Sequence, residues 1–176
     1  MADEAGEHLA VLKNAILMEL EGKDFFERAI DTVKNQRSKD MFSGLVKQEL
    51  RHIDILSREF EKLSKGECWL SLKEANSKRS EAAPLSVFKD AEIKRIKLSP
   101  DAGELEVLKL GMEVEKKSID YYSAAQNKVK NTKAKEVFKW LVGEESGHLT
   151  ILNAEYDYRQ KSGYYYDNQE FSLEVM

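Results

Sequence analysis

Two short motifs in the sequence place a histidine three residues after a glutamate, a spacing that puts both side chains on one face of an α-helix. They are Glu49-x-x-His52 and Glu145-x-x-His148, and they use two of the three histidines in the chain. Carboxylate oxygen and imidazole nitrogen together suit Fe, Mn or Zn as ligands. One such motif would arise easily by chance in a chain so rich in glutamate, whereas two copies predict two related halves of a metal site.

Both motifs lie in an internal repeat with an offset of 96 residues. Residues 15–60 align with residues 111–156 without a gap, and 15 of the 46 positions are identical. The alignment also pairs Glu19 with Glu115. We therefore interpret the chain as a duplicated unit.

Each copy of the unit is predicted to be a helical hairpin. Apolar residues recur at helical spacing from about residue 6 to 34 and, after a polar interruption, on to about residue 65, so that the first hairpin covers 6–65. The second hairpin covers 101–161, with its turn near residue 131. Ser99-Pro100 is the expected N-cap and first-turn proline of its first helix, and Gly163 the expected stop signal of its last.

Composition and length favour a single all-α domain, residues 1–176, built as a four-helix bundle. Only two prolines and nine glycines occur in the chain, which disfavours sheet and loop-rich folds. The connection 66–100 is long enough, at about 3.3 Å per residue, to run the length of the bundle. We expect it to be a crossover that makes the second and third long helices parallel, with residues 86–98 as a candidate short helix. The tail 162–176 is expected to pack over a neighbour or a partner subunit.

Charge and cysteine content exclude several classes of protein. The net charge of −4 has no basic stripe that would indicate nucleic-acid binding. No apolar run approaches the ~18 residues of a membrane span, and the acidic start lacks a signal-peptide core, so we expect a cytoplasmic protein without a membrane partner. Cys68 is the only cysteine, which excludes an internal disulfide and a rubredoxin-type iron centre within this sequence.

The hairpin geometry predicts where the motif residues meet. Residues equidistant from a tight turn lie level, and the midpoint between Glu19 and the Glu49/His52 pair falls near residue 35. The copy behaves in the same way around residue 131, so both hairpins should present their acidic and imidazole side chains at mid-height of one core. The predicted cluster consists of Glu19, Glu49, His52, Glu115, Glu145 and His148.

Four carboxylates and two imidazoles in a protein interior require neutralisation, because an isolated buried charge costs several kcal/mol. Two divalent cations balance the four negative charges, and neutral histidines complete the coordination. One Glu from each of two helices and a Glu-x-x-His pair from each of two others is the ligand set of di-iron and di-manganese carboxylate bundles. All six positions of that set are filled here.

At these residues the sequence resembles the ferritin-like di-iron carboxylate proteins, and among them the rubrerythrin branch. The stretches that carry the resemblance are Glu19-x6-Phe26 with Glu49-Leu-Arg-His52, and Glu115-x6-Tyr122 with Glu145-Ser-Gly-His148. The resemblance covers the four long helices and implies a ferritin-like bundle with two Fe ions, with Mn or Zn as alternatives. It further implies that Glu49 and Glu145 bridge the metals, that Glu19 and Glu115 are terminal carboxylates, and that His52 and His148 are terminal nitrogen ligands.

Two departures from the rubrerythrin pattern bear on function. Rubrerythrins carry a C-terminal rubredoxin-like domain with CxxC pairs, which this sequence lacks. They also have a further glutamate one turn before the third-helix ligand, where this sequence has Met112. An external electron donor would therefore be needed.

The resemblance favours an enzyme of the peroxidase or oxidase type, an oxidoreductase that reduces H2O2 or O2 in the response to oxidative stress. Two other functions are compatible with the same residues. One is ferritin-like iron oxidation and handling, and the other is a structural bundle in which metals only fasten the helices. A homodimer is the expected assembly.

Three residues next to the cluster have two interpretations each. Glu144 is expected either to accept a hydrogen bond from His52 or to be solvated, and Gln48 either to pair with His148 or to be solvated. Tyr122 is expected either to pack in the core or to donate to a ligand carboxylate and serve as a redox tyrosine.

Three other residues are predicted to lie outside the site. Trp69 and Trp140 are expected in packing or dimer contacts. His8 is expected to be exposed.

Overall fold

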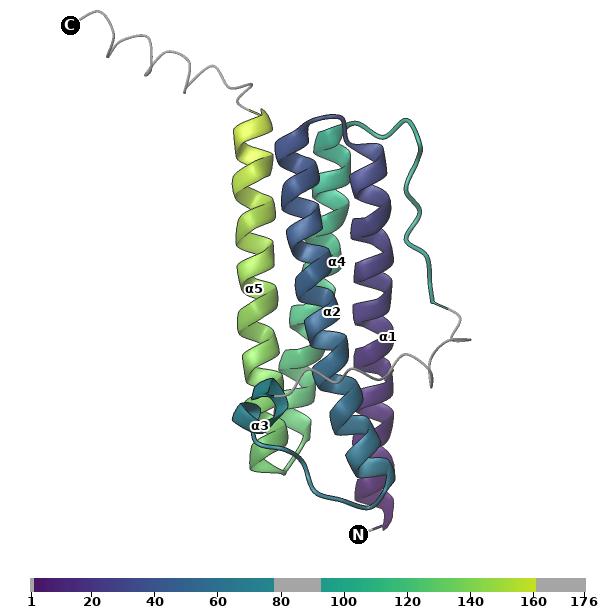
Figure 1. Cartoon of the computed structure of the whole chain (residues 1–176), viewed down its shortest axis with the longest axis vertical. Helices are drawn as coiled ribbons and strands as arrows, with labels where there is room; N and C mark the ends of the chain where they lie inside the picture. Colours follow the sequence, from purple (N-terminus) through teal and green to yellow (C-terminus); the bar gives the residue numbers. More distant parts are fainter. Residues whose placement is uncertain (1, 78–92, 161–176) are drawn as a thin grey trace, which may run out of the picture.

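The computed structural model describes residues 2–77 and 93–160, and these residues contain helices and no strand. The all-α four-helix prediction is therefore confirmed. Four long helices form the bundle, and a short helix, α3, contacts α2 and α5 near one end (Figure 1). The helices are α1 (Ala2–Thr32), α2 (Gln36–Ser64), α3 (Leu72–Ser77), α4 (Glu104–Lys128) and α5 (Thr132–Gln160).

The long crossover makes α2 and α4 parallel, as predicted. Helices α1 and α5 run in one direction along the bundle, and α2 and α4 in the other (Figure 1). The described end of the crossover lies beside α1, where the N–H of Lys94 donates to Glu21 at 2.9 Å and Arg95 lies 3.5 Å from Asp24. Residues 93–98 are not helical, and the rest of the candidate helix, 86–92, lies outside the described residues.

Equivalent asparagines close the two hairpins and start the helices that follow. The side-chain oxygen of Asn35 accepts the N–H of Arg37 at 2.9 Å, and that of Asn131 accepts the N–H of Ala134 at 3.1 Å. Asparagine is a favourable N-cap because its side chain satisfies backbone donors that a helix start leaves free. The two turns predicted near residues 35 and 131 therefore fix the height at which the motif residues of each hairpin lie.

The prediction that Ser99-Pro100 starts the third long helix is wrong. Ser99 instead closes a separate turn, with its carbonyl accepting the N–H of Ala102 at 3.1 Å, and α4 starts at Glu104 with Gly103 as N-cap. A tertiary contact places this start, because one oxygen of Glu104 accepts the N–H groups of Lys34 and Asn35. The predicted stop at Gly163 lies outside the described residues.

His8 is half-buried rather than exposed, because the crossover covers it. Trp69 is buried and packs edge-on against Phe138, and its ring N–H donates to Nδ1 of His8 at 3.4 Å. Trp69 is thus a packing residue, as predicted. Among the helices of the described residues, none combines the length and hydropathy of a transmembrane segment.

The apolar core divides into two clusters, one toward each end of the bundle. One cluster includes Leu12, Ile16, Leu56, Phe138 and Leu141. The other includes Phe25, Phe42, Leu45, Val107, Leu108 and Leu152. Every motif residue falls, along its own helix, between members of the two clusters, so the fold reserves a polar layer between two apolar ones.

A second pair of equivalent buried glutamates lies outside this polar layer. Glu59 accepts the N–H of Leu70 at 3.0 Å with one oxygen, while its other oxygen has no hydrogen-bond partner. Its counterpart Glu155 accepts the hydroxyl of Ser38 at 3.1 Å and pairs with Arg37 at 3.0 Å. Burial raises the pKa of Glu59 from 4.5 to about 7. Glu59 therefore anchors the start of the crossover with a carboxylate that is poorly solvated when ionised.

Glu59→Gln should raise the free energy of unfolding by about 1–3 kcal/mol at about pH 8, as measured by urea denaturation. The folded-state pKa lies above the unfolded value, so ionisation destabilises the fold as pH rises from about 4.5 through about 7. Glutamine keeps an acceptor for Leu70 without the charge. The gain should therefore disappear near pH 4.5.

Glu155→Gln is the matched control, and it should lower stability because Glu155 has arginine partners. A Glu59→Gln protein less stable than the parent at about pH 8 would contradict the account.

Candidate metal centre

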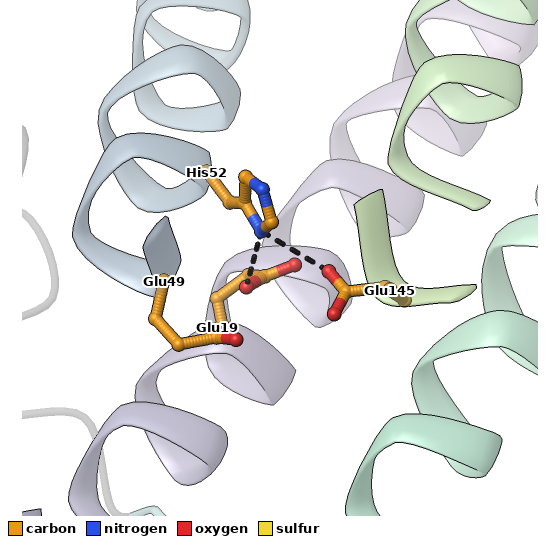
Figure 2. Close-up of side chains that lie close together, drawn as sticks. All are labelled: Glu19, Glu49, His52 and Glu145. Carbon is orange, nitrogen blue, oxygen red and sulfur yellow. Dashed lines mark hydrogen bonds and ion pairs between the residues drawn. The ribbon is translucent and has the colours of Figure 1, made fainter. Parts of the chain in front are cut away.

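The structure brings all six motif residues together at mid-height of the bundle. Helix α1 supplies Glu19, α2 supplies Glu49 and His52, α4 supplies Glu115, and α5 supplies Glu145 and His148. All six are buried, with at most 3% of any residue exposed. Figure 2 shows four of them, with Glu19, Glu49 and Glu145 gathered below the ring of His52.

The cluster consists of two groups of four residues, and the two groups share two carboxylates. In each group, one ligand atom from every residue lies within 4.8 Å of the others. Glu49 and Glu145 belong to both groups, and these are the two residues that the family resemblance assigns as bridges. The groups are Glu19, Glu49, His52 and Glu145, and Glu49, Glu115, Glu145 and His148.

Glu145 connects the two histidines. Its Oε1 lies 3.1 Å from Nδ1 of His52, and its Oε2 lies 3.0 Å from Nδ1 of His148. Each histidine also faces its own terminal carboxylate at 3.3 Å, Glu19 for His52 and Glu115 for His148. The two imidazole rings stack, with centroids 5.5 Å apart. Both histidines therefore direct Nδ1 into the cluster, and one carboxylate spans the space between them.

Burial and mutual proximity shift the ionisation of the carboxylates. Burial raises the pKa of Glu49 well above its usual value, and the nearby carboxylate of Glu19 raises it further. Burial likewise raises the pKa of Glu115. For Glu145, burial acts in the same direction, but the imidazoles of His148 and His52, at 3.0 and 3.1 Å from its oxygens, hold its pKa below the usual range.

The same carboxylates raise the basicity of both imidazoles. Burial alone would lower the pKa of each histidine, but the surrounding carboxylates outweigh it. The pKa of His52 is raised well above its usual value, and that of His148 is raised to about 12. Without a metal, the cluster retains protons because its carboxylates cannot all be charged together in a dry interior.

The unpaired atoms of the cluster fit metal ligands. Both oxygens of Glu145, Oε1 of Glu49 and Oε1 of Glu115 are buried and have no hydrogen-bond partner among the described residues. Buried carboxylate oxygens without a donor are costly unless a cation takes the place of the donor. Oxygen-rich groups completed by one imidazole each suit Fe, Mn or Zn.

Residues outside the six surround His52 on the Nε2 side of its ring, which points away from the cluster. Oε2 of Glu144 lies 3.7 Å from Nε2 of His52 and 3.5 Å from the Arg51 guanidinium. Arg51 in turn donates to Asn76 of α3 at 2.8 Å and lies over the ring of Trp140. Glu144 therefore lies on the side of His52 that was expected, but at 3.7 Å it does not accept the expected hydrogen bond, and it remains 27% exposed.

Trp140 takes part in the surroundings of the site, contrary to the expectation for this residue. Its ring meets that of His52 edge-on, with centroids 5.3 Å apart. The sequence marks neither this contact nor the one between Arg51 and Asn76, because both depend on how α2, α3 and α5 pack. The spacing within one helix carries no information about them.

The remaining two neighbours behave differently from each other. The hydroxyl of Tyr122 donates a hydrogen bond to Oε1 of Glu19, so this tyrosine both packs in the core and contacts the cluster. Gln48 is half-buried, and no hydrogen bond joins it to His148, whose Nε2 lacks a partner in the described structure. The expected pairing of Gln48 with His148 is therefore absent.

A helical bundle whose four long helices bury two such groups has the architecture of the ferritin-like di-iron carboxylate proteins. Comparison with protein families agrees with this class, because residues 10–156 match the rubrerythrin family model. The chain belongs to the rubrerythrin family.

Among solved structures, the hypothetical protein Pfu-1136390-001 from Pyrococcus furiosus has a similar fold, with a TM-score of 0.59 and 19% sequence identity. The match covers 86% of this chain and 89% of that protein. The search of curated proteins gave no match.

Metal binding should release protons and should become stronger as pH rises. Glu49 and Glu115 have raised pKa values and must lose protons to become ligands, and the raised pKa values of His52 and His148 impose the same requirement. Calorimetric titration with Zn²⁺ in two buffers of different ionisation enthalpy measures the number of protons released. Net proton uptake, or an affinity that falls between about pH 6 and pH 8, would contradict these pKa directions.

Proposed function

We propose that the protein binds two iron ions in this cluster and uses them to reduce hydrogen peroxide or dioxygen with electrons from an external donor. The observation that carries the proposal is the pair of four-residue groups that share Glu49 and Glu145. Two metals held by shared carboxylates can deliver two electrons together, one from each ion. For peroxide, two electrons and two protons cleave the O–O bond and give two water molecules.

The protein residues would supply position, charge balance and exclusion of water. The four carboxylates balance the charge of two divalent ions, and Nδ1 of each histidine completes one group. Tyr122 fixes the orientation of Glu19 by donating to Oε1, which leaves Oε2 directed at the cluster. The apolar clusters on both sides limit the access of bulk water.

Glu144 extends the interactions of the site to the protein surface. It lies between the buried Nε2 of His52 and the exposed guanidinium of Arg51. The side chains of Arg51 and Glu144 are 52% and 27% exposed, so polar contacts lead from His52 to solvent on this face of α2 and α5. An external donor would approach most closely here.

The proposal is tested by anaerobic loading with Fe²⁺ followed by one equivalent of H2O2. We expect about two irons per chain by elemental analysis and consumption of one peroxide per two irons oxidised, followed by stopped-flow absorbance. Glu49→Ala removes a carboxylate that both groups share. It should slow peroxide consumption by more than about 100-fold, since even partners of metal ligands contribute 10–100-fold.

Two controls separate redox chemistry from a metal that only fastens the helices. Glu113→Ala changes an exposed glutamate on the same helix as Glu115 and should leave the rate unchanged. The Zn²⁺-loaded protein should bind two ions and leave peroxide intact, because Zn²⁺ has no redox chemistry. Equal rates of peroxide consumption by Glu49→Ala and by the parent protein would contradict the proposal.

A further inference from the structure

The two four-residue groups are equivalent by the repeat, yet the residues around them differ. At three pairs of equivalent positions, only one member can support a ligand of the cluster. The pairs, with the supporting member first, are Tyr122 and Phe26, Glu144 and Gln48, and Arg51 and Gly147. All three supporting members act on one group, the one that contains Glu19 and His52.

We propose that the two metal positions are unequal, with the Glu19–His52 position filled first and held more tightly, and the Glu115–His148 position filled second and exchangeable. This inference rests on the proposed function, because it requires that the cluster binds two metals. It concerns the residues that position the ligands and not the ligands themselves.

The terminal carboxylates show the first difference. The hydroxyl of Tyr122 donates to Oε1 of Glu19, while Oε2 of Glu19 points to Nδ1 of His52 at 3.3 Å. At the equivalent position Phe26 has no donor, and Oε1 of Glu115 is buried without a hydrogen-bond partner. A carboxylate whose orientation is already fixed loses less conformational freedom when it binds a metal.

The imidazoles show the second difference. A carboxylate behind a ligand histidine fixes the tautomer and increases the electron donation of the nitrogen that binds the metal. Glu144 takes this place behind His52, and Arg51 together with Asn76 holds it there. Behind His148 the equivalent residue is the neutral Gln48, which makes no hydrogen bond to the ring.

The lack of support at His148 is visible in the structure itself. In the described part of the chain, Nε2 of both histidines is buried without a hydrogen-bond partner, but only that of His52 faces a carboxylate, Oε2 of Glu144 at 3.7 Å. Gly147 stands where the other half has Arg51, so no guanidinium is available to hold a carboxylate there. Loss of one outer partner typically changes metal affinity by 10–100-fold, and we expect the two positions to differ by at least that factor.

The experiment is a titration of the ¹⁵N-histidine-labelled protein with Zn²⁺, followed by NMR of the ring nitrogens. The chain has only three histidines, so His52 and His148 each report one position and His8 serves as an internal reference. We expect the Nδ1 resonance of His52 to shift during the first equivalent and that of His148 during the second. The resonances of the three histidines are assigned with single His→Gln variants.

Two variants should make the metal affinities of the two positions more similar. Glu144→Ala should weaken the first binding step by about 10-fold or more, and Gln48→Glu should strengthen the second, both measured by competition with a chelator. Glu136→Ala, an exposed glutamate on the same helix as Glu144, is the control and should change neither step. Thermal unfolding of each metal-free variant verifies that the bundle is intact.

The possible outcomes separate this inference from the function on which it rests. If His148 shifts first, or if both histidines shift in parallel in the parent protein, the positions are not ordered as proposed, while the two-metal site stands. If neither His52 nor His148 shifts at two equivalents, the two-metal function itself fails.

Discussion

The burial of four carboxylates and two imidazoles in one layer is the constraint on which the rest of this structure depends. These groups lie between two apolar clusters, and each of the six faces other members of the layer. Such an arrangement is unfavourable for charges alone, since desolvation of an ion costs more than imperfect pairing returns. The helices around the layer must therefore hold the six side chains at one level, so that protons or cations can balance them.

The duplicated hairpin holds the six side chains at one level through a small number of structural features. Equal numbers of residues separate each motif from its turn, and an asparagine cap fixes where each following helix begins. The parallel crossover then brings the two hairpins together at the same height. Glu104 strengthens this alignment, because it ties the start of α4 to the turn between α1 and α2.

The sequence was sufficient to predict the six clustered residues, because their positions follow from helix periodicity and from counting residues to a turn. It was also sufficient for the four long helices and the direction of the crossover. It was insufficient for the start of α4, where Glu104 binds a distant turn and overrides the local signal of Ser99-Pro100. The short helix α3 was missed for the same reason, since its six residues gain their stability from α2 and α5.

The surroundings of His52 illustrate the same limit at the level of single side chains. A role for Glu144 could be predicted because it directly precedes the second motif, and because Gln48 occupies the equivalent position before the first. Trp140 on α5 and Asn76 on α3 approach from elements other than α2, and only the packed structure brings them to His52 and Arg51. Contacts of this kind have no periodicity in the sequence.

The division of ligands between the hairpins has a consequence for how such a protein can arise. Each group takes three residues from one hairpin and one shared carboxylate from the other. A half-length ancestor could complete a group only by association of two copies, and its symmetry would have made both groups identical. Fusion of the two copies into one gene removes that symmetry, since a substitution then alters one half alone. Tyr122 differs from its equivalent Phe26, and Glu144 from its equivalent Gln48, as expected if the two halves have changed independently.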